Sequence, residues 1–436
     1  MRIRLKRTFQ SLTVRNYRLF ATGQLVKLVG VWMMFISQDW LVLQLSGNSA
    51  TAVGFTVAMQ FTPILLLTLF AGVLADRYDK RKVLLAANTV SIAFAIALGL
   101  LVVTGTVQLW HVFVAAAGIG AANAIENPTR QAFVSELVGG NLLPNALSLN
   151  AAVFNTARII GPAAAGGAIA LFGVGPAFLI ATAGLVAPLF SLTRLRPAEL
   201  YREPLLPRGE RERTTVSDGL RYVWRRPDLV MPITLVAVVG AAGFNYQVTL
   251  PVLSKVVYET GAAAFGLLAA GLAIGSLAGA LAGSWRRERP SAYVVLWAAV
   301  GFGAFSMLVG FASPYWLVLA LLLPTGFFAI YFAQAANQRV QLGCDGGFRG
   351  RVMALYVLVF LGTTPLGALA VGWWAERYGA ESAIWLGGLA SLLAAFAGLT
   401  WQLRHHGEQL RVQIRPQPRL YVVRPDPAPA ELGSRG

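Results

Sequence analysis

Cysteine and histidine are almost absent from this sequence. Its 436 residues include one cysteine, Cys344, and three histidines. A single cysteine cannot form a disulfide bond within the chain, and these few thiol and imidazole groups form no cluster with the spacing of a metal site. The sequence also lacks a G-x-x-x-x-G-K-[ST] phosphate-binding loop, which argues against an ATP-driven pump. We therefore expect no enzymatic activity, no metal ion and no cofactor.

Charge is scarce as well. Charged residues make up 13% of the chain, well below the ~25% of soluble domains. Hydrophobic residues make up 56%, and the mean hydropathy is +0.61. Apolar stretches of about twenty residues, the length that a helix needs to cross a membrane, recur along the chain. They are continuous rather than alternating, which favours helices over a β-barrel. The composition predicts an all-α membrane protein.

We predict twelve membrane-spanning helices. Their expected ranges are 17–44, 51–75, 83–104, 108–133, 146–172, 176–195, 229–257, 261–284, 291–311, 315–340, 352–375 and 381–403. The first stretch is too long for a signal peptide and lacks a cleavage site of small residues, so we expect it to stay in the protein.

The positive charges predict the orientation of these helices. If the N-terminus lies inside, 32 of the 36 lysines and arginines fall in the inner segments. The positive-inside rule then places both termini in the cytoplasm. The net charge of +17 comes from loops rather than from a basic face on a soluble domain, so we expect no nucleic-acid partner.

The chain divides into two similar halves. Residues 149–173 match residues 355–379 at six positions with one offset of 206. We expect two pseudo-symmetric six-helix bundles, the arrangement of transporters that rock around a site in the middle of the membrane. The predicted domains are an N-terminal bundle at 1–195, a cytoplasmic linker at 196–228, a C-terminal bundle at 229–403 and a disordered cytoplasmic tail at 404–436. The linker has the pattern of an amphipathic helix on the inner membrane surface, with a solvated segment as the alternative.

A charged loop, GVLADRYDKRK at 72–82, separates two long apolar runs. A plain positive-inside loop explains its cations but gives no reason for its two aspartates. With G-x-L-A-D-R-x-D-x-R-K intact, the loop closely resembles the signature loop of the major facilitator superfamily. The resemblance implies a cytoplasmic latch in which Asp76 meets the N-terminal end of a helix in the other half and holds the outward-open state. The expected gating residues of this loop are Gly72, Asp76, Arg77, Asp79, Arg81 and Lys82.

Three further segments narrow this resemblance. ENPTRQAFVSELV at 126–138, LPNALSLNAAVFNTARIIGP at 143–162 and RGRVMALYVLVFLGTTPLGALAVG at 349–372 look like the enterobactin-exporter-like branch, whose members are often described as transmembrane secretion effectors. The resemblance implies siderophore export across the bacterial cytoplasmic (inner) membrane. GPAAAGG at 161–167 resembles a fifth-span element of proton-coupled exporters, but with three residues rather than two between its proline and the next glycine. We expect hinge or packing roles, which glycines also serve in ordinary helix contacts, for Gly161, Pro162, Gly166, Gly367 and Gly372.

Charged residues within the predicted spans indicate functional positions, because each costs at least ~2.5 kcal/mol at mid-membrane unless it is paired or hydrated. Lys27 and Arg158 lie near the middle of their spans. Each is a candidate contact for an anionic substrate, with a structural pair to a carboxylate or carbonyl as the alternative. Asp39 is the candidate for proton coupling, with an interfacial aspartate that never titrates as the alternative. Glu126 and Arg130 share one helix face, where they can pair with each other or with the charged loop, and we predict a gating role.

Uncharged polar residues within the spans are further cavity candidates, although hydrogen bonding between helices is their commoner use. These candidates are Gln60, Asn123, Asn155, Asn245, Gln334 and Asn337. The tryptophans Trp32, Trp40, Trp373 and Trp374 are expected in aromatic belts at the membrane surfaces.

Together these features predict a monomeric secondary transporter whose partners are a small-molecule substrate, protons and anionic lipid of the inner leaflet. We expect it to export a siderophore-like or drug-like molecule, with anionic substrates among the candidates, by proton antiport with alternating access. Proton-coupled uptake by symport is the alternative, which the element at 161–167 disfavours.

Overall fold

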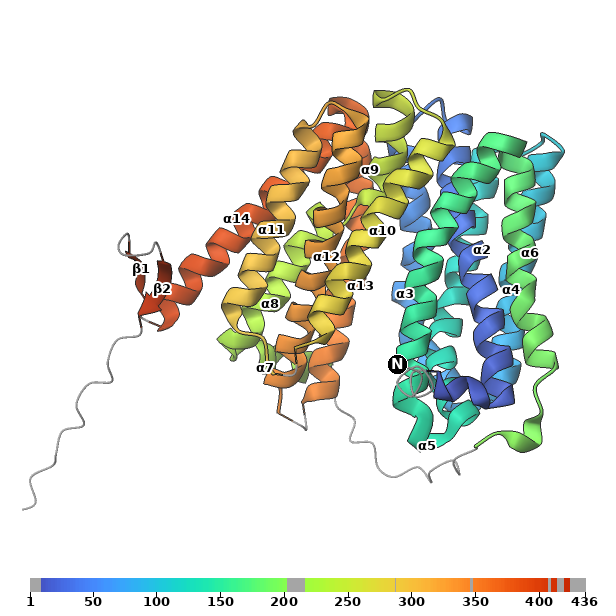
Figure 1. Cartoon of the computed structure of the whole chain (residues 1–436), viewed down its shortest axis with the longest axis horizontal. Helices are drawn as coiled ribbons and strands as arrows, with labels where there is room; N and C mark the ends of the chain where they lie inside the picture. Colours follow the sequence, from blue (N-terminus) through green and yellow to red (C-terminus); the bar gives the residue numbers. More distant parts are fainter. Residues whose placement is uncertain are drawn as a thin grey trace, which may run out of the picture.

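The computed structural model describes residues 9–201, 216–286, 288–345, 348–406, 409–413 and 419–423. Within these ranges only the backbone is described for residues 68, 69, 72, 73, 75, 76, 216–219, 405, 406, 409–413 and 419–423. Two helical bundles stand side by side, and a short hairpin follows the last helix (Figure 1).

The first bundle comprises five helices after a short 3-10 turn at Gln10–Thr13. They are α2 Arg15–Leu45, α3 Ala50–Arg77, α4 Lys80–Val103, α5 Leu109–Phe172 and α6 Val174–Thr193. α2 packs against α5 and α6, while α3 and α4 each pack against α5. A short 3-10 turn, Pro197–Glu199, follows this bundle.

The second bundle follows the linker helix α7, Val216–Trp224. Its helices are α8 Pro227–Val238, α9 Tyr246–Val252, α10 Ala262–Ser284, α11 Ala292–Phe311, α12 Tyr315–Gly343, α13 Arg349–Tyr378 and α14 Ala380–His406. π-helical turns at Val239–Gly243 and Leu253–Val257 follow α8 and α9, so that 227–257 forms one interrupted membrane-spanning segment. The two bundles meet where α3 contacts α13 and where α5 contacts α10.

In the described part of the chain, eleven helices are long and apolar enough to cross a membrane. We predicted twelve, and the difference lies in α5, whose 64 residues cover the fourth and fifth predicted spans. A helix of that length is about 96 Å long, several times the ~30 Å hydrocarbon core. The backbone leaves the helical region at Gly139, where φ is +70°. Glycine adopts this conformation without strain, so α5 is divided there into two helical segments.

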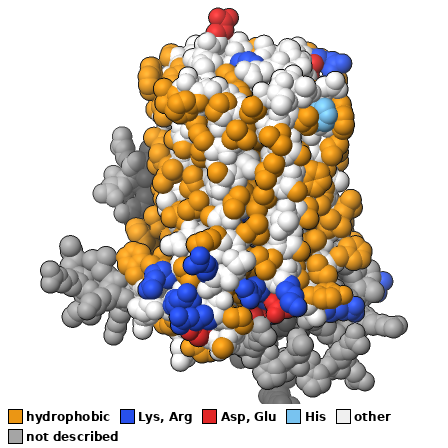
Figure 2. All heavy atoms as spheres, turned by 90° about the vertical axis from the view of Figure 1, so that its right-hand side faces the viewer, with side chains coloured by type: hydrophobic (Ala, Val, Ile, Leu, Met, Phe, Trp, Pro, Cys, Tyr) orange, Lys and Arg blue, Asp and Glu red, His pale blue; other side chains and the backbone are white. Residues whose placement is uncertain are grey.

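Charge distinguishes the two ends of the molecule. Figure 2 shows hydrophobic side chains along the wall of the first bundle and Lys and Arg side chains gathered at its lower end. This end, which we call the basic end, carries the turn between α3 and α4 and the end of α6. The opposite end carries the turns at 46–49, 104–108, 258–261 and 312–314.

Side-chain caps fix several helix starts. The Asp79 carboxylate accepts hydrogen bonds from the backbone N–H groups of Arg81 (2.9 Å) and Lys82 (3.3 Å) and so begins α4. Ser49 caps α3 in the same way, because its hydroxyl accepts from Ala52 N–H (3.1 Å). Capping bonds satisfy N–H groups that have no partner inside the helix. Asp79, one of the two aspartates in the charged loop, therefore has a structural role in this state.

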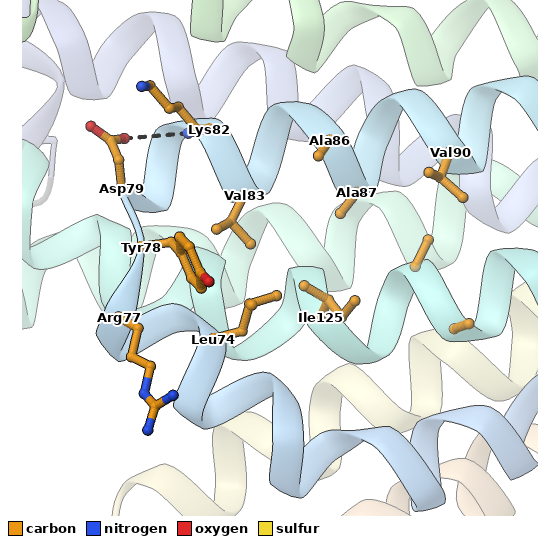
Figure 3. Close-up of a pocket in the computed structure, with 12 residues that line it drawn as sticks. Leu74, Arg77, Tyr78, Asp79, Lys82, Val83, Ala86, Ala87, Val90 and Ile125 are labelled. Carbon is orange, nitrogen blue, oxygen red and sulfur yellow. Dashed lines mark hydrogen bonds between the residues drawn. The ribbon is translucent and has the colours of Figure 1, made fainter.

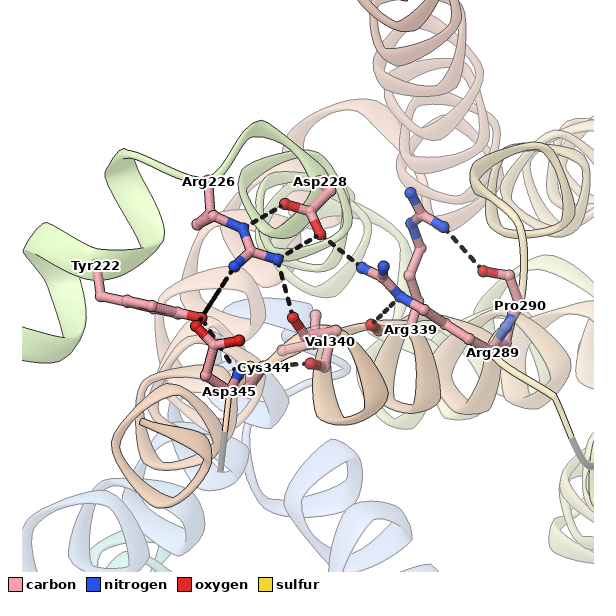
Figure 4. Close-up of polar contacts among 10 residues, drawn as sticks. Tyr222, Arg226, Asp228, Arg289, Pro290, Arg339, Val340, Cys344 and Asp345 are labelled. Carbon is pink, nitrogen blue, oxygen red and sulfur yellow. Dashed lines mark hydrogen bonds and ion pairs between the residues drawn. The ribbon is translucent and has the colours of Figure 1, made fainter. Parts of the chain in front are cut away.

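The linker helix α7 packs partly against the second bundle. Val223 is buried, and the Tyr222 ring stacks on Phe348 with 4.4 Å between centroids. The Tyr222 hydroxyl donates to Asp345 (2.7 Å), as Figure 4 shows. Leu220 and Trp224 remain exposed. The helix that the amphipathic pattern predicted is therefore present, and its place on the inner membrane surface stays a prediction.

A polar cluster at the basic end ties this linker to three helices (Figure 4). Arg226 Nε lies 3.0 Å from Asp228 Oδ1, and Asp228 also accepts from Arg289 (2.7 Å) in the loop between α10 and α11. Arg289 donates to the carbonyl of Arg339 near the end of α12 (3.2 Å). Hydrogen bonds to Asp228 raise the pKa of Arg226 above its ordinary value. The guanidinium therefore remains charged at every physiological pH.

The tail differs from the predicted disorder at 404–436. α14 continues to His406, and β1 Gln409–Gln413 pairs antiparallel with β2 Arg419–Val423, with Gln409 opposite Val423. Apolar residues alternate with polar ones in β1, a pattern typical of strands. The prediction relied on the basic, proline-rich composition and missed this local alternation. The rest of the tail lies outside the described residues.

Small residues allow the two bundles to approach closely toward the opposite end. A Cβ on Gly166 of α5 would lie 2.7 Å from the Ala262 carbonyl oxygen at the start of α10. A Cβ on Gly372 of α13 would lie 2.8 Å from the Ala50 carbonyl oxygen at the start of α3. Both distances are too short for any side chain. The backbones therefore touch only because these positions are glycine.

The other predicted packing glycines lie within single bundles. A Cβ on Gly161 would collide with Trp32 of α2, and a Cβ on Gly367 would collide with Ala241. Pro162 lies one residue after Gly161 in α5. Gly161 and Gly367 shape their own bundles. Pro162, like Gly166 and Gly372, lies at the contact between the two, because a Cβ on Gly266 of α10 would collide with the Pro162 carbonyl oxygen.

Replacing Gly166 with leucine tests this contact. The new side chain would collide with the backbone at Ala262, so we expect the bundles to separate at the opposite end in most molecules. Spin labels at Thr51→Cys and Arg377→Cys, introduced into a Cys344→Ser background, would then report a longer distance than in the parent protein.

Gly167→Leu is the matched control, because a Cβ at Gly167 meets nothing within 4 Å. We expect this variant to keep the parent distance. An equal lengthening in both leucine variants would show that the contact at Gly166 does not hold the bundles together.

Candidate functional site

A cavity of about 430 Å³ lies between the two bundles, and we call it the central cavity. The first bundle contributes Trp32, Phe35, Ile36, Asp39, Phe61, Arg158 and Pro162. The second bundle contributes, among others, Phe244, Tyr246, Gln247, Phe265, Ser276, Phe360 and Thr364. Because both bundles line it, any movement of one bundle against the other changes its shape.

Aromatic rings form much of the cavity wall. The Trp32 ring lies 5.7 Å from that of Phe35, and across the cavity Phe244 lies edge-on to Phe360 with 6.2 Å between centroids. Such walls offer flat apolar faces and ring edges to an aromatic ligand. We expected Trp32 in an interfacial belt, but the structure places it at the cavity.

Arg158 places a positive charge in this aromatic wall. Its guanidinium carbon lies 5.7 Å from the centroid of the Trp32 ring. Among the described side chains no carboxylate forms an ion pair with it. A cation over an aromatic face is held electrostatically while its N–H donors stay available. Of the structural alternative, a pair with a carboxylate or carbonyl, the carboxylate part therefore has no support within the described residues.

Asp39 is the only carboxylate among the described residues that line the cavity. It is 2% exposed, and its Oδ1 has no hydrogen-bond partner within the described part of the chain. Trp32, Phe35, Ile36 and Asp39 follow the i, i+3, i+4, i+7 spacing of one helix face. This spacing in the sequence could have identified the α2 wall of the cavity.

Lys27 lies in a separate buried ion-pair cluster. Its ammonium group pairs with Glu126, whose other oxygen lies 3.6 Å from Arg130 Nε. The Lys27 and Glu126 side chains are 3% and 6% exposed, and neither lines the central cavity. This geometry favours the structural alternative for Lys27. The gating role of Glu126 and Arg130 stays a prediction, because the cluster joins α2 to α5 within one bundle.

Hydrogen bonds and an ion pair attach the charged loop to its own bundle. Arg81 donates to the carbonyl groups of Leu192 (2.8 Å) and Thr193 (3.2 Å) at the end of α6, and Lys80 pairs with Glu136 (2.5 Å). The side chains of Gly72 and Asp76 lie outside the described residues, while those of Arg77 and Lys82 are exposed. The predicted latch belongs to a state in which the basic ends meet, and it stays a prediction.

The remaining polar candidates lie outside the described lining of the cavity: Gln60, Asn123, Asn155, Asn245, Gln334 and Asn337. Gln60 nevertheless joins the bundles, because it accepts a hydrogen bond from Gln247 (3.1 Å). Asn155 and Asn245 each donate to a carbonyl four residues earlier in their own helices. Sequence reasoning missed Gln247, which lines the cavity from the start of α9.

Polar and aromatic contacts close the molecule at the opposite end. The Glu376 carboxylate accepts from the Ser49 hydroxyl (2.8 Å) and the Thr51 N–H (2.9 Å), so it caps α3 from the other bundle. Trp40 is buried and stacks on Phe265 with 6.3 Å between centroids. We expected Trp40 in a surface belt, and the structure places it in this closure instead. The central cavity therefore lies beneath a closed opposite end.

Of the described residues, no three histidine, cysteine or acidic side chains are placed to hold a metal ion. Cys344 is buried, and its thiol donates to the carbonyl of Val340 (3.0 Å). Among the described residues that line the central cavity, the charged groups are one carboxylate and one guanidinium. The guanidinium can bind an anionic group of a ligand, and the carboxylate can accept hydrogen bonds or take up a proton.

Comparison with protein families gives one match over nearly the whole chain. The model of a family described as transmembrane secretion effector covers residues 7–424. Among curated proteins, the chain is 29% identical to the multidrug efflux pump Tap of Mycolicibacterium fortuitum over 80% of this chain and 87% of that protein. It is 25% identical to the enterobactin exporter EntS of Citrobacter koseri over 76% and 78% of the two chains.

A third relative matches over a shorter range. The chain is 28% identical to the staphyloferrin A transporter of Staphylococcus aureus over 59% of its own length, and the match spans 64% of that transporter. Solved structures show the same fold at low identity. A POT family transporter in complex with 5-aminolevulinic acid superposes with a TM-score of 0.71 at 11% identity, covering 89% of this chain and 96% of that one. The nucleoside transporter NupG superposes with a TM-score of 0.70 at 11% identity, covering 88% and 98%.

Replacing Glu126 with glutamine tests the buried cluster. The substitution leaves the Lys27 ammonium buried without its counter-charge, which typically costs about 3–5 kcal/mol. We expect a clear fall in the midpoint of thermal unfolding, followed in detergent by intrinsic fluorescence. Glu136→Gln is the matched control, because its pair with Lys80 is more exposed and such pairs contribute about 1 kcal/mol or less. Equal losses in the two variants would contradict this assignment.

Proposed function

Because the chain belongs to the transmembrane secretion effector family of the major facilitator superfamily, we propose that this transporter exports a small molecule in exchange for protons. The observation that carries the proposal is the central cavity, where Asp39 and Arg158 stand in an aromatic wall between two bundles. The names of two relatives, the efflux pump Tap and the exporter EntS, support the outward direction.

The orientation is part of this proposal. We place the basic end in the cytoplasm of a bacterium, because 32 of the 36 lysines and arginines then lie inside. α5 would cross the membrane twice, with Gly139 at the inner side, which gives twelve crossings and two cytoplasmic termini. The closed opposite end would then face outward, so that the structure corresponds to an inward-facing state.

The cavity suits a drug-sized substrate with aromatic or other flat apolar parts. Its volume of about 430 Å³ falls within the ~300–1,000 Å³ of typical ligand sites. Arg158 would bind a carboxylate or catecholate group, and such groups are common in siderophores. The names of two relatives, transporters of staphyloferrin A and enterobactin, support a siderophore-like substrate, and that of Tap supports a drug-like one.

Proton exchange requires that the proton and the substrate exclude each other. Asp39 meets this requirement for a substrate that places a hydroxyl or amine beside it, because these groups donate a stronger hydrogen bond to the ionised carboxylate than to the protonated one. Protonation from outside would release the substrate, and loss of the proton to the cytoplasm would prepare the site again. A two-state protein converts this difference in affinity into coupled movement.

Uptake by symport is the second candidate, and one observation favours it. An anion bound at Arg158 in the same cavity as Asp39 is bound better when Asp39 carries a proton, because the proton removes a like charge. That arrangement moves the substrate and the proton in the same direction. The sign of the coupling therefore distinguishes the two functions.

Transport by vesicles with an imposed pH gradient tests the function and the role of Asp39. Inverted vesicles that contain the wild type should accumulate substrate when their interior is acidic. Asp39→Asn should lose accumulation but retain downhill exchange, because asparagine binds substrate without exchanging a proton. Accumulation driven by an acidic exterior would establish symport, and unchanged accumulation in Asp39→Asn would remove Asp39 from the coupling. Glu259→Gln, which removes an exposed carboxylate at the opposite end, should behave as the wild type.

Substitution of Arg158 tests the anion site. Arg158→Gln should raise the KM for a carboxylate or catecholate substrate roughly 10- to 100-fold, because a hydrogen bond to a charged group contributes about 1.5–3 kcal/mol. The KM for a neutral aromatic drug should stay near that of the wild type. Arg194→Gln is the matched control, since Arg194 also lies over a ring, that of Phe190 at 4.7 Å, but outside the cavity. Equal effects on charged and neutral substrates would contradict the assignment.

A further inference from the structure

A second cavity, of about 600 Å³, lies on the wall of the first bundle. Figure 3 shows it between α3 and α4, with α5 behind them. α3 and α4 each pack mainly against α5 rather than against each other, which leaves this groove between them. None of its lining residues lines the central cavity. The groove is therefore separate from the transport site.

The groove is amphipathic along its length. Its walls are apolar and include Leu74, Val83, Val90 and Ile125. At the basic end, where α3 turns into α4, it is bordered by Arg77, Tyr78 and Lys82. Val90 is 45% exposed and Tyr78 is 61% exposed, so both ends of the groove reach the surface. One molecule that fills it would have to be apolar at one end and polar at the other.

The charges at the polar end favour an anion. Arg77 and Lys82 are exposed and stand on either side of Tyr78 in Figure 3. Asp79 is the one described carboxylate in the lining, and it accepts hydrogen bonds from the N–H groups of Arg81 and Lys82. One of its oxygens, Oδ1, is therefore directed at the start of α4. The two cations and the phenol hydroxyl remain as groups that can bind a phosphate.

We propose that this groove binds one anionic phospholipid, with its phosphate at Arg77, Tyr78 and Lys82 and one acyl chain along Val83, Val90 and Ile125. The order of charged and apolar parts in the groove fits a lipid. Its two cations lie where α3 ends and α4 begins, and its apolar part continues toward the middle of α4. Basic residues at this level attract anionic headgroups. The leaflet is the inner one if the basic end is cytoplasmic, which rests on the proposed function.

Such a lipid would be a structural ligand of the charged loop. It would contact α3, α4 and α5 at once and fill the space that the protein leaves between α3 and α4. A ligand that binds only the folded state stabilises it, and the stabilisation grows with the logarithm of the ratio of ligand concentration to Kd. We therefore expect the protein to be more resistant to heat in the presence of the anionic lipid than in that of a zwitterionic lipid.

Lipid retention in native mass spectrometry tests the site without any transport assay. The wild type, purified in detergent with equal amounts of phosphatidylglycerol and phosphatidylcholine, should retain one phosphatidylglycerol. The double variant Arg77→Gln with Lys82→Gln should retain it about 30-fold more weakly, because each cation near an anionic headgroup contributes about a factor of five. Ala86→Trp, which fills the apolar part, should also lose the lipid while keeping both cations.

The double variant Arg194→Gln with Arg196→Gln is the matched control. It removes two cations from the same end of the bundle but outside the groove, and it should retain the lipid as the wild type does. If this control lost the lipid to the same extent as the Arg77→Gln, Lys82→Gln variant, the overall positive charge of this end would attract the lipid. The proposed site would then be wrong. Retention in Ala86→Trp would show that the groove itself holds no acyl chain and would also overturn it. These measurements involve no transport, so their outcomes would be the same if the protein exported nothing. The lipid site and the proposed export function can therefore be refuted separately.

Discussion

Backbone contact between the bundles toward the opposite end is the constraint on which the rest of this structure depends. α5 meets α10 at Gly166, and α3 meets α13 at Gly372, at distances that leave no room for a Cβ. Because lipid tails are as apolar as the helices, close packing of small residues is one of the few forces that join helices in a membrane. The carboxylate of Glu376 adds hydrogen bonds to the start of α3. Together these contacts close one end and leave the central cavity beneath it.

The rare charges of the membrane region divide into two groups. Lys27 and Glu126 neutralise each other within one bundle and so permit a buried connection between α2 and α5. Asp39 and Arg158 face the cavity without a charged partner among the described residues. Unpaired charges at such depth are costly, and a site that binds a substrate and a proton explains their presence better than stability does.

Much of the fold was predictable from the sequence, because apolar stretches of membrane-spanning length, separated by charged loops, indicate membrane helices directly. The break within α5 was predictable as well, because Gly139 lies between the predicted spans 108–133 and 146–172. The helical residues that extend these spans up to Gly139 were not, since apolar length indicates only the part of a helix that crosses the membrane. At the site, Asp39 and Arg158 were found because charge is conspicuous in an apolar span. The aromatic wall was missed, because a ring has the same apolar character whether it faces lipid or a cavity. The ion pair of Lys27 was not assigned from the sequence, because its partner, Glu126, is far away along the chain.

The central claim is that the two bundles close at one end while they open at the other. Fluorescent labels at Lys82→Cys and Arg351→Cys measure the separation of the bundles at the basic end, and labels at Thr51→Cys and Arg377→Cys measure it at the opposite end. Single-molecule energy transfer during transport tests the relation between the two distances. The account predicts that substrate and a pH gradient shorten the first distance whenever they lengthen the second. Distances that change together, or an opposite end that stays closed throughout turnover, would contradict it.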